Sequence, residues 1–310
     1  MHRLKNWQLL AICVLTWGTT WYAITFQIGH TSPEVSVALR FGLAGDVVLA
    51  MCALRGIRLR FTLRDHARLA LQGAFLYGLS YLCVYHAEQH VVSALVAVGY
   101  SASPLVSGLG AQALFGTRVS RRFVCGGVLG LVGVALIFWP ELAKTATGLG
   151  HGIGNGRSAA LGALFTVAAV LLSAVGSLTA SRNRRHGLPF WPALGFGMVY
   201  GAALCATVAL LQGSSFAVPA AGAWWASLLY LSLAGSVLAF ACFLTLQERI
   251  GPGPAGTVGV LTPLLALAVS VGFERFHPDV LTFIGAGLAL LGNGLMLGVA
   301  RRPKPAPSPA

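Results

Sequence analysis

The chain has 310 residues, of which 56% are hydrophobic and only 9% are charged. Soluble domains carry about a quarter charged residues, so this composition predicts a membrane protein and excludes an ordinary soluble fold. The formal charge of +13 does not indicate nucleic-acid binding, because Lys and Arg fall almost entirely in short gaps between apolar runs. The six cysteines are scattered singly without a CxxC pair, so we expect small core residues and no disulfide framework, metal or cofactor.

Ten apolar runs are long enough to cross a lipid bilayer, whose hydrocarbon core requires about 20 apolar residues per helix. The sequence therefore predicts an all-α integral membrane protein with ten transmembrane helices. The first run is too long for a signal peptide and lacks a small-residue cleavage site, so no cleaved leader is expected. The approximate limits of the runs are 7–28, 34–54, 68–86, 91–115, 122–140, 158–180, 189–211, 222–246, 252–274 and 280–300.

Lys and Arg residues in the gaps between these runs divide unevenly between the two sides of the membrane. One side receives seventeen of them, and the other receives only Lys144, Arg157 and Arg275. Because cytoplasmic loops carry the excess of positive charge, this division predicts a cell-membrane protein with both termini in the cytoplasm. The seventeen are Arg3, Lys5, Arg55, Arg58, Arg60, Arg64, Arg68, Arg118, Arg121, Arg122, Arg182, Arg184, Arg185, Arg249, Arg301, Arg302 and Lys304.

A stretch of the first half, residues 93–139, recurs in the second half at a constant offset of 159 residues. Pro104-Leu105 falls on Pro263-Leu264, so a proline interrupts an apolar run in both copies. Paired interruptions of this kind indicate the binding region of a transporter. The other matches are Gly126, Leu129, Leu131, Gly133 and Leu136 with Gly285, Leu288, Leu290, Gly292 and Leu295.

The repeat predicts how the chain is divided. Residues 1–140 form the first five-helix repeat, 141–157 an outer linker, 158–300 the second five-helix repeat, and 301–310 a disordered cytoplasmic tail. Because five is an odd number, the second repeat must be inserted upside down relative to the first. The glycines of GLGHGIGNG in the linker indicate flexibility and not a phosphate-binding loop, since no strand precedes them.

Two charged residues of the second run are candidates for a transport pathway, because charges inside hydrocarbon are costly and are usually functional. Asp46 lies near the middle of the run and is interpreted either as a carboxylate that responds to a proton or substrate, or as a buried polar contact. Arg40 is either an anion anchor or a structural tether, and we expect it to extend outward to Glu34 or the headgroups. Six residues correspond to about 240° around a helix, so the two are not expected to pair.

Aromatic and hydroxyl residues recur with helical spacing near the bilayer centre, where Tyr and Trp are less common than at the interfaces. We interpret them as the lining of a cavity for an apolar or zwitterionic metabolite. Each aromatic ring taken singly is also consistent with packing. The residues are Trp17, Thr20 and Trp21 in the first run, Tyr77 and Tyr81 in the third, and Tyr100, Ser103 and Ser107 in the fourth.

Pro104 and Pro263 remove backbone donors and predict helix kinks about one turn earlier, around Tyr100 and Gly259. The freed carbonyls need partners in protein or cavity water, so both kinks are candidate substrate contacts. Small residues elsewhere predict close helix packing. They include Gly126, Gly127, Gly130 and Gly133 in the fifth run and Gly285, Gly287 and Gly292 in the tenth.

His86, Glu88 and His90 lie at the gap between the third and fourth runs. We interpret them as a polar outer cap, with a pH-sensitive gate as the alternative. A zinc site is not favoured, because the chain must turn here and helical spacing of the two histidines cannot be assumed.

Five stretches carry a family resemblance: WGTTWYAITFQIG, SPEVSVALRFGLAG, YHAEQHVVSALVAVGYSASPLV, QERIGPGPAGTVGVLTPLLALAVSVGFE and GAGLALLGNGLML. They resemble the EamA-type permeases of the drug/metabolite transporter superfamily, over nearly the whole chain from Trp7 to Leu297. The resemblance implies ten helices in two inverted five-helix repeats, and export of small organic metabolites, with amino acids prominent. The chain departs from the family at Gly116-Thr117, where members commonly carry Gly-Glu, whereas the second half keeps an acid at Glu274.

Together the patterns predict an exporter of small organic molecules that works by alternating access. Its expected partners are a small-molecule solute and the lipid bilayer, with protons as a candidate coupling ion. Facilitated diffusion, import of similar solutes, and a non-transporting scaffold or sensor are the alternatives. An enzyme is not expected, because the sequence contains no HExxH, no GxSxG, no paired carboxylates and no Cys/His constellation.

Overall fold

The computed structural model describes residues 4–116, 119–146, 156–250 and 257–298, and every regular element within these ranges is a helix. Thr117, most of the predicted linker and the predicted tail lie outside the described residues. The first half contains α1 (Asn6–Thr25), α2 (Pro33–Leu54), α3 (Leu63–Gly73), η1 (Ala74–Leu79), α4 (Ser80–Glu88), α5 (Ser93–Gly99), η2 (Tyr100–Ala102), α6 (Ser103–Phe115) and α7 (Arg121–Ala146). The second half contains α8 (Gly156–Arg185), α9 (Phe190–Leu211), α10 (Gly222–Leu229), η3 (Tyr230–Leu238), α11 (Ala239–Ile250), α13 (Thr257–Phe273) and α14 (Val280–Gly298).

The all-helical membrane class predicted from the sequence is confirmed. Seven helical stretches of the described residues are long and apolar enough to cross a membrane, and two shorter apolar helices follow at Leu261–Phe273 and Val280–Met296. α1 is less apolar, because hydroxyl and amide side chains interrupt it. The seven stretches are Pro33–Leu54, Leu63–Glu88, Ser93–Phe115, Arg121–Pro140, Ala159–Arg185, Phe190–Leu211 and Gly222–Phe243.

Local sequence signals set several helix ends. Ser32 caps α2, accepting a hydrogen bond from the Val35 backbone at 3.3 Å, and Pro33 occupies the first helical position, where its missing N–H costs nothing. α6 ends at Gly116, whose φ of 69° lies in the left-handed region that favours glycine. Ser32 and Pro33 therefore fix where the second hydrophobic stretch begins, and Gly116 fixes where the fourth ends.

The third hydrophobic stretch of each half is interrupted by a π-helical segment. η1 separates α3 from α4, and η3 separates α10 from α11. The sequence predicted neither interruption, since its hydrophobic pattern continues through both. π-helical turns inside α-helices are often found at functional sites, and the two halves share this feature at corresponding places.

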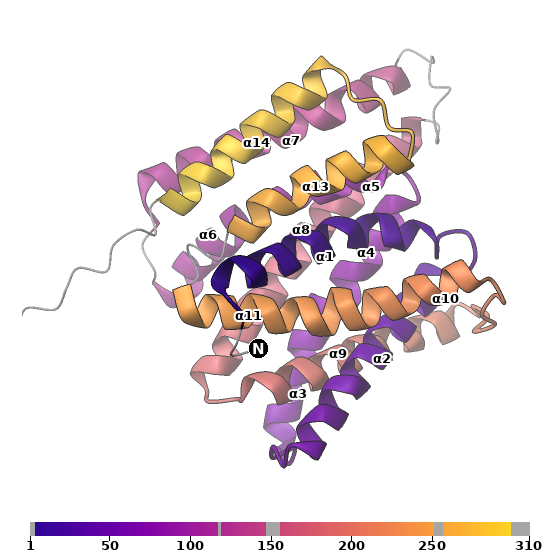
Figure 1. Cartoon of the computed structure of the whole chain (residues 1–310), viewed down its shortest axis with the longest axis vertical. Coiled ribbons are helices and arrows are strands. Elements are labelled where there is room, and N and C mark those ends of the chain that lie inside the picture. The colour runs from indigo at the N-terminus through magenta and orange to yellow at the C-terminus, as the bar shows by residue number, and fades with distance from the viewer. Residues whose placement is uncertain (1–3, 117–118, 147–155, 251–256, 299–310) are drawn as a thin grey trace, which may run out of the picture.

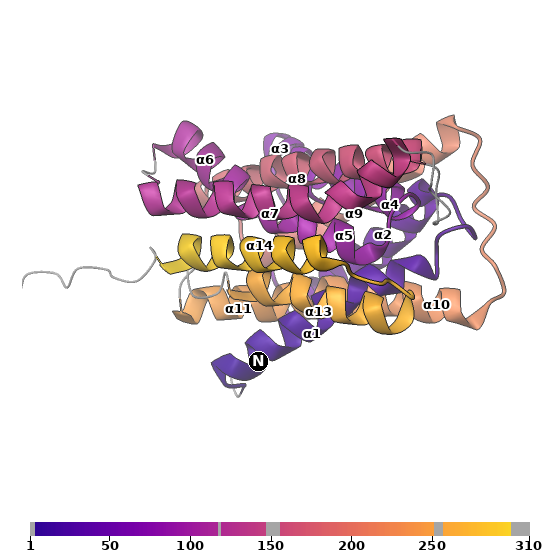
Figure 2. The same cartoon turned by 90° about the horizontal axis from the view of Figure 1, so that it is seen from above.

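The helices of the two halves pack in an exchanged pattern, shown in Figures 1 and 2. α2 packs along α9, and α7 packs along α14, so helices at corresponding places contact each other. α1 packs on α13 and α11, while α8 packs in the same way on α6 and α4. Helix α1 of the first half therefore packs on the second half in the way that α8 of the second half packs on the first.

Glycines bring α7 and α14 into direct backbone contact. A Cβ on Gly126 would lie 2.5 Å from the carbonyl oxygen of Gly292, and a Cβ on Gly285 would lie 2.5 Å from that of Gly133. The pairing is reciprocal, because the offset of 159 residues relates Gly126 to Gly285 and Gly133 to Gly292. The packing role predicted for these four glycines agrees with this geometry, whereas Gly130 and Gly287 face open space.

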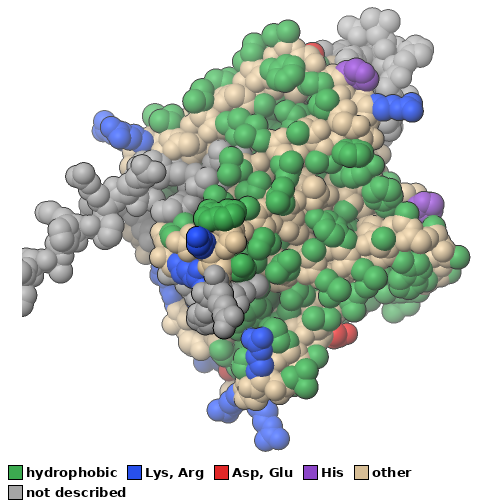
Figure 3. Space-filling model, in the orientation of Figure 1, with side chains coloured by type: hydrophobic (Ala, Val, Ile, Leu, Met, Phe, Trp, Pro, Cys, Tyr) green, Lys and Arg blue, Asp and Glu red, His purple; other side chains and the backbone are tan. Residues whose placement is uncertain are grey.

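The bundle has two distinct ends. We call the end where α1 begins and α14 ends the terminal end, and the end where α4 stops and α5 starts the Glu88 end. Figure 3 shows that most Lys and Arg side chains on the visible face gather along the left and lower edge, toward the terminal end. The predicted charge division therefore coincides with a physical end of the molecule.

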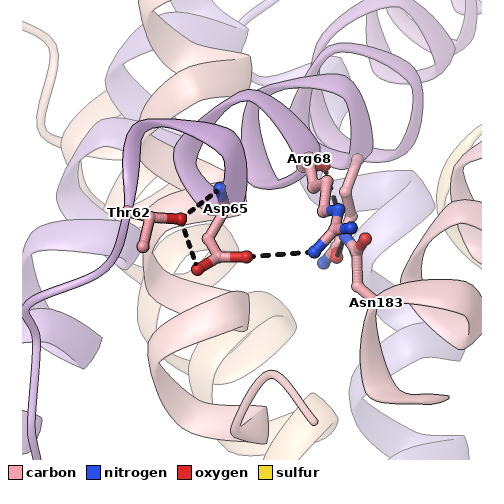
Figure 4. A network of polar contacts seen from close by, with 5 residues as sticks. Thr62, Asp65, Arg68 and Asn183 are labelled. Atoms are coloured by element: carbon pink, nitrogen blue, oxygen red, sulfur yellow. Dashed lines mark hydrogen bonds and ion pairs between the residues drawn. The ribbon is translucent and has the colours of Figure 1, made fainter. Parts of the chain in front are cut away.

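A polar network joins the halves at the terminal end (Figure 4). Thr62 caps α3, accepting from the Asp65 backbone at 3.2 Å, and Asp65 pairs with Arg68 at 3.1 Å. From α8, the Asn183 side chain donates to the Arg68 carbonyl oxygen at 3.2 Å and to Gln72 Oε1 at 2.9 Å. These bonds hold the start of α3 beside the end of α8.

The α7–α14 contact predicts opposite effects for two substitutions on one helix. Gly133→Ala places a methyl group 2.6 Å from the Ala289 backbone nitrogen, which forces the helices apart and lowers the free energy of unfolding by about 1–3 kcal/mol. Gly130→Ala meets nothing within 4 Å and should raise stability by up to about 1 kcal/mol through helix propensity. Denaturation in detergent micelles measures both, and equal stability of the two variants would contradict this packing.

Candidate functional site

A cavity of about 310 Å³ lies between helices of both halves. α1, α2, α4, η2 and α6 contribute residues from the first half, and α11 and α13 contribute Phe240, Phe243 and Thr262, among others, from the second. Nine of the twelve residues predicted for the pathway and the kinks line it: Trp17, Thr20, Trp21, Arg40, Tyr81, Tyr100, Ser103, Pro104 and Pro263.

One face of α1 forms an aromatic wall of the cavity. The Trp17 indole N–H donates to the Gly235 carbonyl oxygen at 3.0 Å, so a residue of the π-helical segment η3 holds this ring in place. The Trp17 ring also contacts Phe240, with centroids 5.3 Å apart. One turn along the helix, Trp21 contacts Tyr100 at 5.3 Å, which closes the wall between α1 and the interrupted fourth stretch.

The two prolines act on their helices differently. Before Pro104 the α-helix gives way to the 3₁₀ turn Tyr100–Ala102, and this break turns Tyr100 and Ser103 toward the cavity. Pro263 lies inside α13, which continues as an α-helix from Thr257 to Phe273. Gly259, one turn before Pro263, lines the cavity with nothing within 4 Å of where its Cβ would be.

Arg40 is the charged residue of the cavity lining. Its side chain is 2% exposed, and its guanidinium carbon lies 5.1 Å from the Phe41 ring centroid and 4.8 Å from that of Tyr81. These contacts are cation–π interactions, which strengthen away from water. The expected outward extension toward Glu34 is wrong, because Glu34 pairs with His86 at 3.0 Å and Arg40 points into the bundle.

Asp46, Tyr77 and Ser107 lie outside the cavity lining. Asp46 is exposed on the surface of α2, consistent with the expected absence of a shared face with Arg40. Tyr77 is buried in η1, where its ring contacts Phe41 at 5.4 Å and Phe240 at 6.0 Å. Tyr77 thus packs against Phe240, which lines the cavity, and against Phe41, whose ring contacts Arg40.

Sequence reasoning missed a polar cluster that joins the halves at the Glu88 end. Glu274 Oε2 accepts hydrogen bonds from the Ser93 backbone at 3.2 Å and from the Ser270 hydroxyl at 2.7 Å. The Ser270 oxygen also accepts from the Ala94 backbone at 3.2 Å. Because Ser93 and Ala94 begin α5 while Ser270 belongs to α13, these bonds fasten one half to the other beside the cavity.

Glu88 lies near this cluster and is 8% exposed. Neither of its carboxylate oxygens has a hydrogen-bond partner within the described part of the chain. It stands one turn beyond Val84, a lining residue, on the same face of α4. Among the described residues, no three His, Cys, Asp or Glu side chains come together as a metal site.

A helical membrane protein with a cavity between its two halves has the arrangement found in many membrane transporters. The sequence model of the EamA-like transporter family matches residues 6–139 and, a second time, residues 160–298. The chain therefore belongs to the EamA-like transporter family, and the resemblance inferred from its motifs is confirmed.

Similar proteins agree with this assignment. The "Uncharacterized inner membrane transporter YedA" of Escherichia coli K12 is 28% identical over 85% of this chain and 81% of its own length. The "Uncharacterized transporter YyaM" of Bacillus subtilis is 24% identical over 96% of this chain and 94% of its own. A solved structure titled "Crystal structure of protein" has the same fold, with a TM-score of 0.65, 22% identity, and coverage of 96% of this chain and 98% of that one.

The hydrogen bond from Trp17 to η3 generates a stability prediction. Trp17→Phe keeps an aromatic ring in the wall but leaves the Gly235 carbonyl without this donor, so the free energy of unfolding should fall by about 1–2 kcal/mol. Trp7→Phe is the matched control, because Trp7 is 63% exposed. Chemical denaturation in mixed micelles compares the two, and no loss in Trp17→Phe relative to Trp7→Phe would show that the bond is dispensable.

Proposed function

We propose that the protein is a secondary transporter that exports small organic molecules across the cell membrane by alternating access. The observation that carries this proposal is the cavity whose lining comes from both halves of the chain. A site shared between two halves can open to either side of a membrane when one half rocks against the other. The export direction rests on the family resemblance.

We also propose that the two halves are five-helix repeats of inverted orientation, giving ten spans over residues 1–140 and 158–300. The reciprocal glycine contacts support this arrangement, because Gly126 meets Gly292 while their counterparts Gly285 and Gly133 meet each other. Corresponding helices that exchange contacts in this way are antiparallel and related by a two-fold axis. Both termini then lie on the positively charged side, the cytoplasm.

The chemistry of the lining indicates an organic solute. Aromatic rings of Trp17, Trp21 and Phe243 supply flat apolar surface, while Thr20 and Ser103 supply hydroxyl groups. A volume near 310 Å³ is at the lower end of the range for small-molecule sites, about 300–1,000 Å³. A compact metabolite with an apolar body fits this cavity better than an inorganic ion, which would need more polar ligands.

Opening at the Glu88 end requires the bonds between halves to break. The contacts of Ser93 and Ala94 with Ser270 and Glu274 fasten α5 to α13 in the described conformation. Rocking of the halves would separate these groups and expose the cavity to the outside. Among the described residues, Glu88 stands one turn from the lining residue Val84 and interacts electrostatically with Glu274, so in this proposal proton coupling runs through these two acids and not through the surface residue Asp46.

A substitution that fills the cavity tests this function. Gly259→Leu places an apolar side chain in the lining without a clash at its Cβ, so folding should persist while saturable flux falls at least about tenfold. Gly287→Leu is the control, because its Cβ also meets nothing and it lies outside the lining.

The measurement is flux of amino acids, purines and amphipathic drugs into liposomes that contain the purified protein. Flux by the Gly287→Leu control should match the unsubstituted protein. The proposal fails if no compound in the panel moves saturably, or if Gly259→Leu transports as well as the unsubstituted chain.

A further inference from the structure

Arg40 presents unsatisfied donors in an apolar site. The side chain is 2% exposed, and its Nε and Nη1 atoms have no hydrogen-bond partner within the described residues. Buried polar groups are nearly always hydrogen-bonded, and a buried charge without a partner is strongly unfavourable. Tyr85 interacts with the guanidinium group through a side-chain hydrogen bond, but the Nε and Nη1 donors lack acceptors among the described residues.

The acids of the described chain are engaged elsewhere or poorly placed. Glu34 pairs with His86, and Glu274 accepts from Ser93 and Ser270. Asp46 lies on another face of α2 and is exposed. The ion pairs found between described residues, Arg68 with Asp65 and His86 with Glu34, do not include Arg40.

Glu88 forms neither an ion pair nor a hydrogen bond with Arg40 in the structure. The two groups interact electrostatically, but both oxygens of Glu88 remain without hydrogen-bond partners in the described part of the molecule. Glu88 is also outside the cavity lining, whereas Arg40 is part of it. Arg40 thus borders the cavity with two guanidinium donors, Nε and Nη1, that no described group satisfies.

The described lining of the cavity offers no carboxylate to pair with a positive charge on the solute. The lining residues that the structure describes include one cation, Arg40, and no acid. An ammonium group in the cavity would lose its hydration beside the positive charge of Arg40, which is unfavourable. A carboxylate would instead accept hydrogen bonds from the planar guanidinium group, whose geometry matches a carboxylate. The rings of Trp17, Trp21 and Tyr100 then contact the body of the solute.

From this arrangement we propose that the cavity selects organic monocarboxylates with an apolar or aromatic body over zwitterions and cations, and that Arg40 binds the carboxylate. The inference rests on the proposed function, because it takes this cavity as the solute site. It narrows the solute class, since a site for zwitterionic amino acids would also need an acceptor for the ammonium group.

The test compares four compounds that share a phenyl-alkyl body and differ in charge. They are 3-phenylpropionate, phenylalanine, 3-phenylpropylamine and 3-phenylpropanol. Quenching of tryptophan fluorescence in the purified full chain at neutral pH measures each Kd, since Trp17 and Trp21 lie in the cavity wall. The propionate should bind at least about tenfold more tightly than the other three, a difference of about 1.4 kcal/mol.

Substitutions assign the preference to Arg40. Arg40→Gln should bring the affinity for 3-phenylpropionate down to that for the alcohol, while the exposed-loop control Arg60→Gln should leave it unchanged. Arg40→Lys keeps the positive charge but replaces the planar guanidinium group by an ammonium group, so it should keep a weaker preference for the anion. This second variant provides the test if Arg40→Gln does not fold.

Several results would overturn the proposal. They are tighter or equal binding of phenylalanine or the amine, unchanged anion binding in Arg40→Gln, loss of all anion preference in Arg40→Lys, or no binding of any of the four compounds. Flux into liposomes separates this inference from the function itself. Binding of the anion without flux would refute transport alone, and saturable flux of phenylalanine without the propionate would refute the selectivity alone.

Discussion

The backbone contact between α7 and α14 is the constraint on which the proposed architecture depends. At Gly126, Gly133, Gly285 and Gly292 there is no room for a Cβ, because the backbone of the opposite helix occupies that space. Between helices in a bilayer, where lipid is as apolar as leucine, such close packing replaces the hydrophobic effect as the source of association. The reciprocal order of these contacts fixes how one half stands against the other, and the cavity lies where the remaining helices of the two halves meet.

A second constraint comes from burying a guanidinium group among aromatic rings. Cation–π contacts with Phe41 and Tyr81 stabilise Arg40, but they leave its Nε and Nη1 donors without acceptors among the described residues. Buried donors without acceptors lower the stability of the protein when no solute is bound. Proteins commonly retain such unfavourable groups at binding sites, where a ligand supplies the missing partner. The broken helix before Pro104 places Tyr100 in the cavity lining, and the π-helical segment η3 bonds to the lining residue Trp17, so two backbone irregularities of the fold adjoin the place where the solute would bind.

The sequence predicted the helices and much of the cavity, because depth and helical spacing place residues on faces. Trp17, Thr20 and Trp21 follow the i, i+3, i+4 pattern and do line the cavity together. The same rule applied to Phe240 and Phe243 would have found their wall in the second half. Arg40 and Asp46 were oriented wrongly or left ambiguous, because the rotation of α2 is set by its packing against α9, which no local pattern encodes. The cluster of Ser93, Ser270 and Glu274 depends on how the halves are placed relative to each other, and the π-helical segments have no hydrophobic signature.

The sidedness of three exposed positions measures the inverted arrangement most directly. Arg64→Cys, Arg184→Cys and His277→Cys are made singly in a chain whose six native cysteines are replaced, and intact cells are treated with a membrane-impermeant maleimide. The account predicts that positions 64 and 184, which both lie near the terminal end, react only after the cells are opened, and that position 277 reacts in intact cells. Reaction of positions 64 and 184 from opposite sides of the membrane would contradict it.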